Sequence, residues 1–181
     1  MSVHIVFEAH STSVDNGAKL ASGWRDVDLS PLGIRQSQEL GDRRKGDGFA
    51  AVLCSDLKRS FYTGKIAFAG TKIPVLRDRR LRECNYGDLN GAPSAVVDAE
   101  KPLRIETPFP NGQSYVQTTA LVKDFLHDIG GHYDGQKVLI IGSRATQYGL
   151  ENIINGVPLA TLVAQKFVWR PGWEYIWGNG R

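Results

Sequence analysis

The chain of 181 residues lacks the features that mark membrane-spanning and secreted proteins. Two cysteines, Cys54 and Cys84, are too few for a secreted disulfide framework, and we expect both to be small buried side chains rather than nucleophiles. No apolar run is long enough to span a bilayer, and the N-terminal one is too short for a signal peptide and lacks a basic leader. We therefore expect a cytoplasmic protein that does not bind membranes.

The sequence also lacks a long run of charge of one sign, and its net charge is only +3. The basic cluster 77–82 is interrupted by Asp78 and followed by Glu83. This composition favours a phosphate-binding or solvated loop over a nucleic-acid surface. The sequence shows no metal-ligand spacing among His4, His127 and His132, so we expect no metal site.

Apolar runs alternate with helical patterns along the chain, which predicts an α/β fold with a mostly parallel sheet in one domain, residues 1–181. The first strand is expected to run from Val3 to the junction with His10. Further strands are expected at 49–54, 73–76, 137–142 and, at an edge of the sheet, 173–177. Helices are expected at 31–44, 57–69, 114–129 and 144–154. We predict a loop at 11–28 and an irregular segment at 77–110 with a short helix at 95–99.

Polar residues follow the predicted strands at their carboxyl ends, where α/β sheets bind ligands. They are His10 after the first strand, Ser55, Asp56 and Arg59 after the second, and Ser143 with Arg144 after the strand at 137–142. Glu83 and Tyr86 lie in the irregular segment. If these positions converge, they form one pocket.

A neutral imidazole at such a place is a nucleophile suited to phosphorus. Phosphoryl transfer also needs donors for the phosphoryl oxygens and an acid for the leaving oxygen. Arg59, in a first helical turn with free helix N–H groups, and Asn16 would be the donors, and Glu83 the acid. The alternatives are a structural histidine at 10, a surface arginine at 59 and a turn-forming asparagine at 16.

Five ordered blocks cover nearly the whole chain and together resemble the motifs of the histidine phosphatase superfamily, which includes phosphoglycerate mutases and small bacterial phosphatases. The blocks are His10 with Asn16 six residues later; Gly23, Asp26, Leu29, Ser30 and Gly33; Ser55-Asp56-Leu57-Lys58-Arg59; Arg80-Leu81-Arg82-Glu83-Cys84-Asn85-Tyr86-Gly87; and Pro110-Asn111-Gly112-Gln113-Ser114. A strand that in the family ends in Gly-His is present at 138–142.

The resemblance implies a three-layer α/β/α sandwich and a phosphomonoesterase that needs neither metal nor organic cofactor. It implies that His10 takes the phosphoryl group, that Glu83 is the general acid and base, and that Arg59 and Asn16 bind phosphate. Other residues that we expect in the substrate site are Ser11, Ser13, Gly23, Tyr86 and Arg144. The expected partner is a small phosphorylated or anionic substrate.

The chain departs from the family pattern at four positions. Ala9 stands in place of the first arginine, Ser11 in place of a glycine and Gln113 in place of a glutamate. Ser143, which we expect among the catalytic residues, stands in place of the second histidine. Hydrogen bonds to charged groups are worth roughly 1.5–3 kcal/mol each. Losing both the arginine and the histidine would therefore cost on the order of 3–6 kcal/mol, or roughly 10²–10⁴ in rate. Arg144 is a candidate substitute cation.

These departures leave alternatives open. Ser143 fits a deliberate His→Ser change or a natural variant, and the absent arginine favours the variant. The function is then a weakened phosphatase, a silent anion-binding module, or an enzyme repurposed for a less anionic substrate. Glu8 would orient His10 or pair with an arginine. The aromatic stretch 169–175 would be core, a homodimer contact or part of the pocket mouth.

Overall fold

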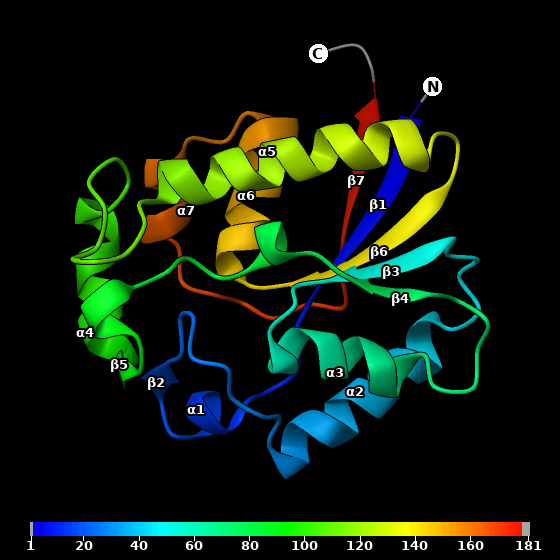
Figure 1. The fold of residues 1–181 in the computed structure, drawn as a ribbon, viewed down its shortest axis with the longest axis horizontal. Helices are drawn as coiled ribbons and strands as arrows, with labels where there is room; N and C mark the ends of the chain where they lie inside the picture. Colours follow the sequence, from blue (N-terminus) through cyan, green and yellow to red (C-terminus); the bar gives the residue numbers. More distant parts are fainter. Residues whose placement is uncertain (1, 179–181) are drawn as a thin grey trace.

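The computed structural model describes residues 2–178, which form a five-stranded sheet between two layers of helices (Figure 1). The strand order is β4-β3-β6-β1-β7. The strands are β1 (Ser2–Ala9), β3 (Ala51–Cys54), β4 (Val75–Arg77), β6 (Lys137–Gly142) and β7 (Trp173–Gly178). The first four are parallel, and β7 pairs antiparallel to β1. The predicted three-layer α/β/α sandwich with a mostly parallel sheet is confirmed.

Each face of the sheet buries its own apolar cluster because side chains alternate along a strand. Ile5 and Phe7 of β1 pack with Phe125 and Leu126 of α5 on one face, whereas Val6 packs on the other. The first face is covered by α5 (Tyr115–His132) and α6 (Arg144–Asn155), and the second by α2 (Pro31–Arg44) and α3 (Lys58–Ala67). Each fully buried side chain of this kind contributes roughly 1.5–3 kcal/mol to stability.

Local capping explains where the long helices begin and end. Ser30 accepts a hydrogen bond from the Gly33 N–H at the start of α2, and Pro31 occupies the first helical position. Ser114 forms a capping box with Gln117 at the start of α5. Gly156 ends α6 in the left-handed region, at φ 70°.

One expectation about a connecting segment was wrong, and one helix was missed. The segment 11–28 is not only loop, because a Ser13–Asn16 capping box starts the short helix α1 (Val14–Gly17) and β2 (Leu20–Ala21) pairs with β5 (Ala92–Pro93). The helix α7 (Leu159–Ala164) was not predicted. The short helix expected in the irregular segment is α4 (Ser94–Glu100), which lies among the 3₁₀ turns Arg79–Leu81, Gly87–Leu89 and Lys101–Leu103.

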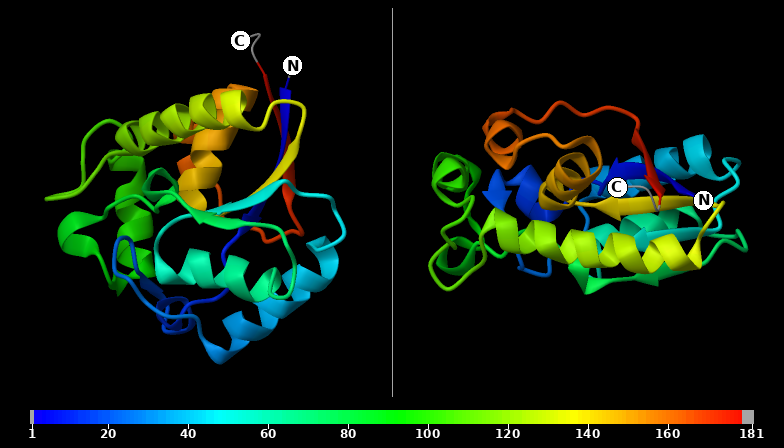
Figure 2. Two further views of the ribbon diagram at one scale, coloured as in Figure 1. Left: turned by 45° about the vertical axis from the view of Figure 1, so that its right-hand side comes forward. Right: turned by 90° about the horizontal axis from the view of Figure 1, so that it is seen from above.

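The sheet register places the candidate site. Ala9 pairs with Gly142, and the His10 N–H donates to the Gly142 carbonyl at 2.9 Å, so His10 and Ser143 follow two neighbouring strand ends. The start of β1 lies beside the end of β7, far from this edge (Figure 2). Within residues 2–178, no helix has both the length and the apolar character required to cross a bilayer.

Candidate active site

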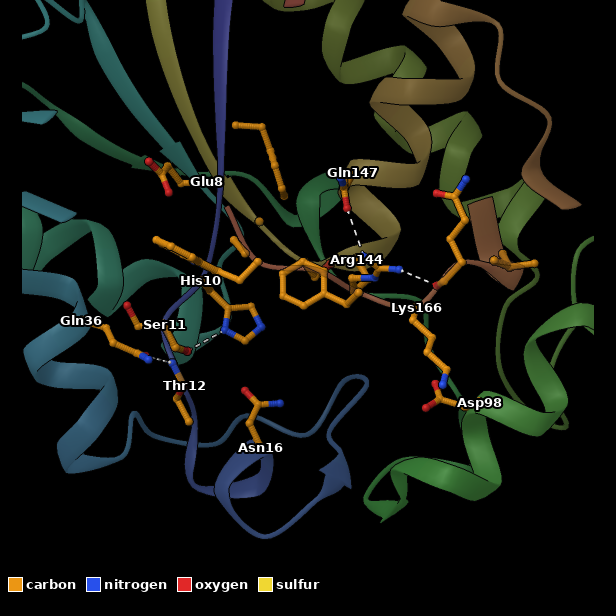
Figure 3. A pocket seen from close by; sticks show the side chains of 18 of the residues that line it. Glu8, His10, Ser11, Thr12, Asn16, Gln36, Asp98, Arg144, Gln147 and Lys166 are labelled. Atoms are coloured by element: carbon orange, nitrogen blue, oxygen red, sulfur yellow. Dashed lines mark hydrogen bonds between the residues drawn. The ribbon is translucent and has the colours of Figure 1, made fainter. Parts of the chain in front are cut away.

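A cavity of about 1110 Å³ opens at the carboxyl ends of β1 and β6. Its floor is made by Ala9, His10, Ser11, Gly142 and Ser143. Figure 3 shows the His10 imidazole between Asn16 and Arg144. Five of the ten expected site residues line this cavity: His10, Ser11, Asn16, Ser143 and Arg144.

The imidazole of His10 has a fixed orientation. Nδ1 lies 2.8 Å from the Ser11 carbonyl oxygen, and a carbonyl can only accept a hydrogen bond. The proton is therefore on Nδ1 and the lone pair on Nε2. Burial, followed by the charge of Arg59, lowers the pKa of His10 to about 4, so the ring is neutral at pH 7. A neutral imidazole with a free Nε2 lone pair is nucleophilic.

Ser13 and Asn16 fix the loop beneath the imidazole. The Ser13 N–H donates to Oδ1 of Asn16, and the Asn16 N–H donates to Oγ of Ser13. Because Oδ1 is engaged in this way, the amide nitrogen of Asn16 is left as a donor for a ligand in the cavity. Ser13 is fully buried and lies outside the cavity lining, where it acts as the cap of α1.

Ser11 connects the first strand to both α2 and α3. Its N–H donates to Oγ1 of Thr63, and its hydroxyl lies 2.9 Å from the Ser37 hydroxyl. The side chain thus belongs to a buried hydroxyl pair, although the residue also lines the cavity. The neighbouring Thr12 N–H donates to Oε1 of Gln36, as the dashed line in Figure 3 shows.

Ser143 is the N-cap residue of α6. Its N–H and its hydroxyl both contact Oγ1 of Thr146, at 3.2 Å each. The Thr146 hydroxyl donates to the Leu81 carbonyl at 2.9 Å, so the Ser143 hydroxyl must donate to Thr146. In this arrangement the Ser143 hydroxyl proton is directed at Thr146 and not into the cavity.

Arg144 is held against the far wall. Its guanidinium donates to Oε1 of Gln147, to the Tyr148 hydroxyl and to the Gln165 carbonyl. No carboxylate pairs with it within residues 2–178. The cavity therefore contains an arginine whose charge is not neutralised.

Arg59 and Glu83 are buried beside the cavity and are not part of its lining. The guanidinium of Arg59 donates to the carbonyls of Gly23 and Arg25, at 2.7 and 2.9 Å. Burial lowers its pKa, and the largest opposing influence is the nearby charge of Glu83. Oε1 of Glu83 accepts the Cys84 N–H at 2.8 Å. These two residues are thus neighbours, and the charge of Arg59 acts on His10.

Gly23 and Tyr86 support this buried layer. Gly23 has φ +54°, and a Cβ there would lie 1.9 Å from Oδ1 of Asn90, so only glycine fits. Tyr86 packs edge-to-face on Phe109 in the third apolar cluster. Of the N–H groups expected to be free at the start of α3, that of Lys58 is engaged, because it donates to Oδ1 of Asp26.

The structure also shows the surroundings of Glu8 and of the two cysteines. Glu8 does not bond to His10, and it accepts hydrogen bonds from Arg44 and Arg43. Both cysteines are buried, and burial raises the pKa of the Cys84 thiol to about 12. In residues 2–178, no group of three or more His, Cys, Asp or Glu side chains is arranged to hold a metal ion.

Sequence reasoning missed three parts of the cavity lining, the smallest of which is Asp98, Lys101 and Pro102. Another is a face of α2 with residues spaced by three or four positions: Gln36, Glu39, Leu40 and Arg43. Their helical periodicity was available, but polar periodicity is equally typical of a solvent-facing surface. The third part is the segment 163–167 with Trp169. The aromatic stretch 169–175 proves to be mixed, since Trp169 lines the cavity while Trp173 and Tyr175 are core.

The fold and the histidine at the strand ends define a phosphoglycerate mutase-like α/β protein. Residues 5–165 match the sequence profile of the histidine phosphatase superfamily (branch 1). The chain therefore belongs to this superfamily. It is 32% identical over 178 residues to the 2,3-bisphosphoglycerate-dependent phosphoglycerate mutase of Cytophaga hutchinsonii, covering 87% of this chain and 83% of that one. The chain spans about half the length of several other phosphoglycerate mutases that it matches.

Solved structures show the same fold. Bacillus stearothermophilus YhfR superimposes with a TM-score of 0.82 at 22% identity, covering 93% of this chain and 88% of that one. A mycobacterial glucosyl-3-phosphoglycerate phosphatase superimposes with a TM-score of 0.79 at 21% identity, covering 91% and 84%. The relatives and structural neighbours of this chain thus include phosphatases and mutases.

Proposed function

We propose that this protein is a phosphomonoesterase that acts on a small phosphorylated metabolite through a phosphohistidine at His10. The observation that carries the proposal is the neutral His10, whose Nδ1 is tied to the Ser11 carbonyl and whose Nε2 lone pair is free on the cavity floor. The relatives, which include mutases and phosphatases, support the same chemistry.

The reaction has two steps. Nε2 of His10 attacks phosphorus, the ester P–O bond breaks, and the acid form of Glu83 gives its proton to the leaving alcohol oxygen. Water then attacks phosphorus, the P–N bond breaks, the carboxylate of Glu83 takes a proton from the water, and inorganic phosphate leaves. Glu83 must reach the leaving oxygen when the ester is bound.

The phosphoryl oxygens need donors in both steps. One donor would be the amide nitrogen of Asn16. The others would be the N–H groups of Arg59 that are not bonded to the carbonyls of Gly23 and Arg25. Arg144 would add charge from the opposite wall. Asn16 lines the cavity and Arg59 is buried beside it, so Arg59 must come within reach of the phosphoryl group when the ester is bound.

We expect the activity to be weak because of Ser143 and Ala9. The Ser143 hydroxyl donates to Thr146, so it donates to a phosphoryl oxygen only by leaving that contact. Ala9 offers no cation. Ala9 favours a second candidate function, an anion-binding or repurposed pocket that handles a less anionic ligand.

The test is hydrolysis of p-nitrophenyl phosphate and of a panel of metabolite phosphates by the wild-type chain and Ser143→His, with His10→Ala as the blank. The phosphatase proposal predicts turnover that Ser143→His raises and His10→Ala abolishes. If all three folded proteins are inactive on the whole panel, the second candidate replaces the first.

A further inference from the structure

The cavity extends well beyond the space around His10. Its volume of about 1110 Å³ exceeds the range of about 300–1,000 Å³ usual for small-molecule sites. Two of its walls are the α2 face with Leu40 and Arg43, and the segment after α7 with Phe167 and Trp169. A substrate that fills this space has a large group besides its phosphate.

The wall after α7 exposes aromatic side chains into the cavity. Phe167 is 44% and Trp169 is 57% exposed, and both line the cavity that contains His10. Aromatic rings left exposed in a concave site are a common mark of ligand contact. Val168 between them is 76% exposed and is not part of the lining. The two rings therefore lie on the cavity side of the segment, and Val168 lies on the other side.

Arginine guanidiniums lie over both rings. The Arg43 guanidinium carbon is 5.6 Å from the Trp169 ring centroid, and that of Arg144 is 4.7 Å from the Phe167 centroid. Guanidinium groups are attracted to aromatic faces, so this wall presents rings and guanidiniums, both of which interact favourably with the face of another ring. Such surfaces favour a planar aromatic group over a saturated one of the same size.

The segment is anchored at its far end. Arg44 donates to the Pro171 carbonyl at 3.0 Å and to Oε1 of the buried Glu8 at 2.9 Å. Gly172 has φ +88°, and a Cβ there would lie 2.2 Å from the Arg44 guanidinium. This anchor ties the aromatic wall to β1, the strand that ends one residue before His10.

We propose that Phe167 and Trp169 form a subsite for a planar aromatic group on the substrate. This proposal rests on the proposed function in one respect: the planar aromatic group is taken to be part of the alcohol that leaves when a phosphomonoester is hydrolysed. Trp169 and Phe167 are then specificity-determining residues, and Arg43 and Arg144 position their rings.

The test compares 2-naphthylmethyl phosphate with its fully saturated decahydro counterpart. A methylene group separates ring and ester oxygen in both, so the two leaving alcohols have nearly equal acidity. We expect kcat/KM to favour the aromatic ester by about 3- to 10-fold in the wild-type chain. The ratio falls to near one in Trp169→Leu and Phe167→Leu, and it is unchanged in Val168→Ala, the matched control.

A wild-type ratio near one with measurable turnover overturns the subsite and leaves the phosphatase intact. If the wild-type chain hydrolyses neither ester, calorimetric titration with the same pair gives the ratio of Kd values. An aromatic preference that Trp169→Leu removes then supports the subsite while the phosphatase proposal fails. Equal Kd values, or no binding of either ester, overturn the subsite.

Discussion

Nδ1 of His10 lies 2.8 Å from the carbonyl oxygen of Ser11, and this one contact fixes the tautomer of the candidate nucleophile. Together with a pKa lowered to about 4, mainly by burial, it gives a neutral ring with Nε2 open to the cavity. The same low pKa has a consequence for stability that does not depend on any substrate.

Acidification should destabilise the fold through His10. Its pKa is about 4 in the folded chain and about 6.5 when unfolded, so between these values the unfolded state binds more protons. The free energy of unfolding therefore falls as the pH drops from 6.5 to 4. At about 1.36 kcal/mol per pKa unit, the full loss is about 3 kcal/mol.

Urea unfolding of the wild-type chain and His10→Gln at several pH values measures this contribution. The wild-type curve should drop more steeply than that of His10→Gln between pH 6.5 and 4, and exposed His132→Gln should follow the wild type. Parallel curves for the wild type and His10→Gln would show that His10 titrates alike in both states.

Ser143→His should raise the rate on an aryl phosphate roughly 10- to 100-fold, because a donor to the phosphoryl group is worth roughly 1.5–3 kcal/mol. The variant also loses the Ser143 cap contact with Thr146, which costs about 1 kcal/mol of stability. Steady-state kinetics with Ser143→Ala as the matched control separates the two effects. An unchanged rate in folded Ser143→His would mean that position 143 does not face the phosphoryl group.

Arg59→Lys should lower both stability and activity. A lysine keeps the charge but cannot donate to the Gly23 and Arg25 carbonyls as a fork, so we expect a loss of about 2 kcal/mol. For a phosphate ligand, kcat/KM should fall by about 10-fold or more. Exposed Arg79→Lys is the control. Full kcat/KM in Arg59→Lys would remove Arg59 from the phosphate site.

Glu8→Ala should lower the free energy of unfolding by about 3–5 kcal/mol, because it leaves the partly buried Arg44 without its main acceptor. Glu174→Ala, which removes an exposed pair with His4, should cost about 0–1 kcal/mol. Thermal and urea unfolding measure both. Equal losses in the two variants would contradict the assignment of Glu8 to a buried ion pair that anchors the segment 165–172.

The sequence predicted the elements whose signals are local. The apolar runs of β1 and β6, the Ser30-Pro31 start of α2 and the Ser114 cap of α5 are all contained in a few residues. Because parallel strands end at the same edge, the pattern also predicted that His10 and Ser143 lie close together. Helix α7 gave no such signal, since Pro158 provides no side-chain cap and burial of Leu162 and Val163 holds the helix in place.

Site details that depend on distant segments could not be predicted. Arg59 was expected as a phosphate ligand on a helix end, and its two carbonyl partners come from residues more than 30 positions away. Two roles were open for Glu8, orienting His10 or pairing with an arginine, and its partner proved to be Arg44 on α2. The cavity wall at Trp169 depends on how the segment after α7 returns to β7, which no local pattern determines.

The most direct test of the central claim is to trap the phosphoryl group. The wild-type chain is mixed with an aryl phosphate, quenched in alkali, and digested for peptide mass spectrometry. We predict a phosphoryl group on the peptide that contains His10, on the imidazole itself, and its absence in His10→Ala. Turnover without any phosphohistidine in the wild-type chain, or undiminished hydrolysis by His10→Ala, would contradict the account.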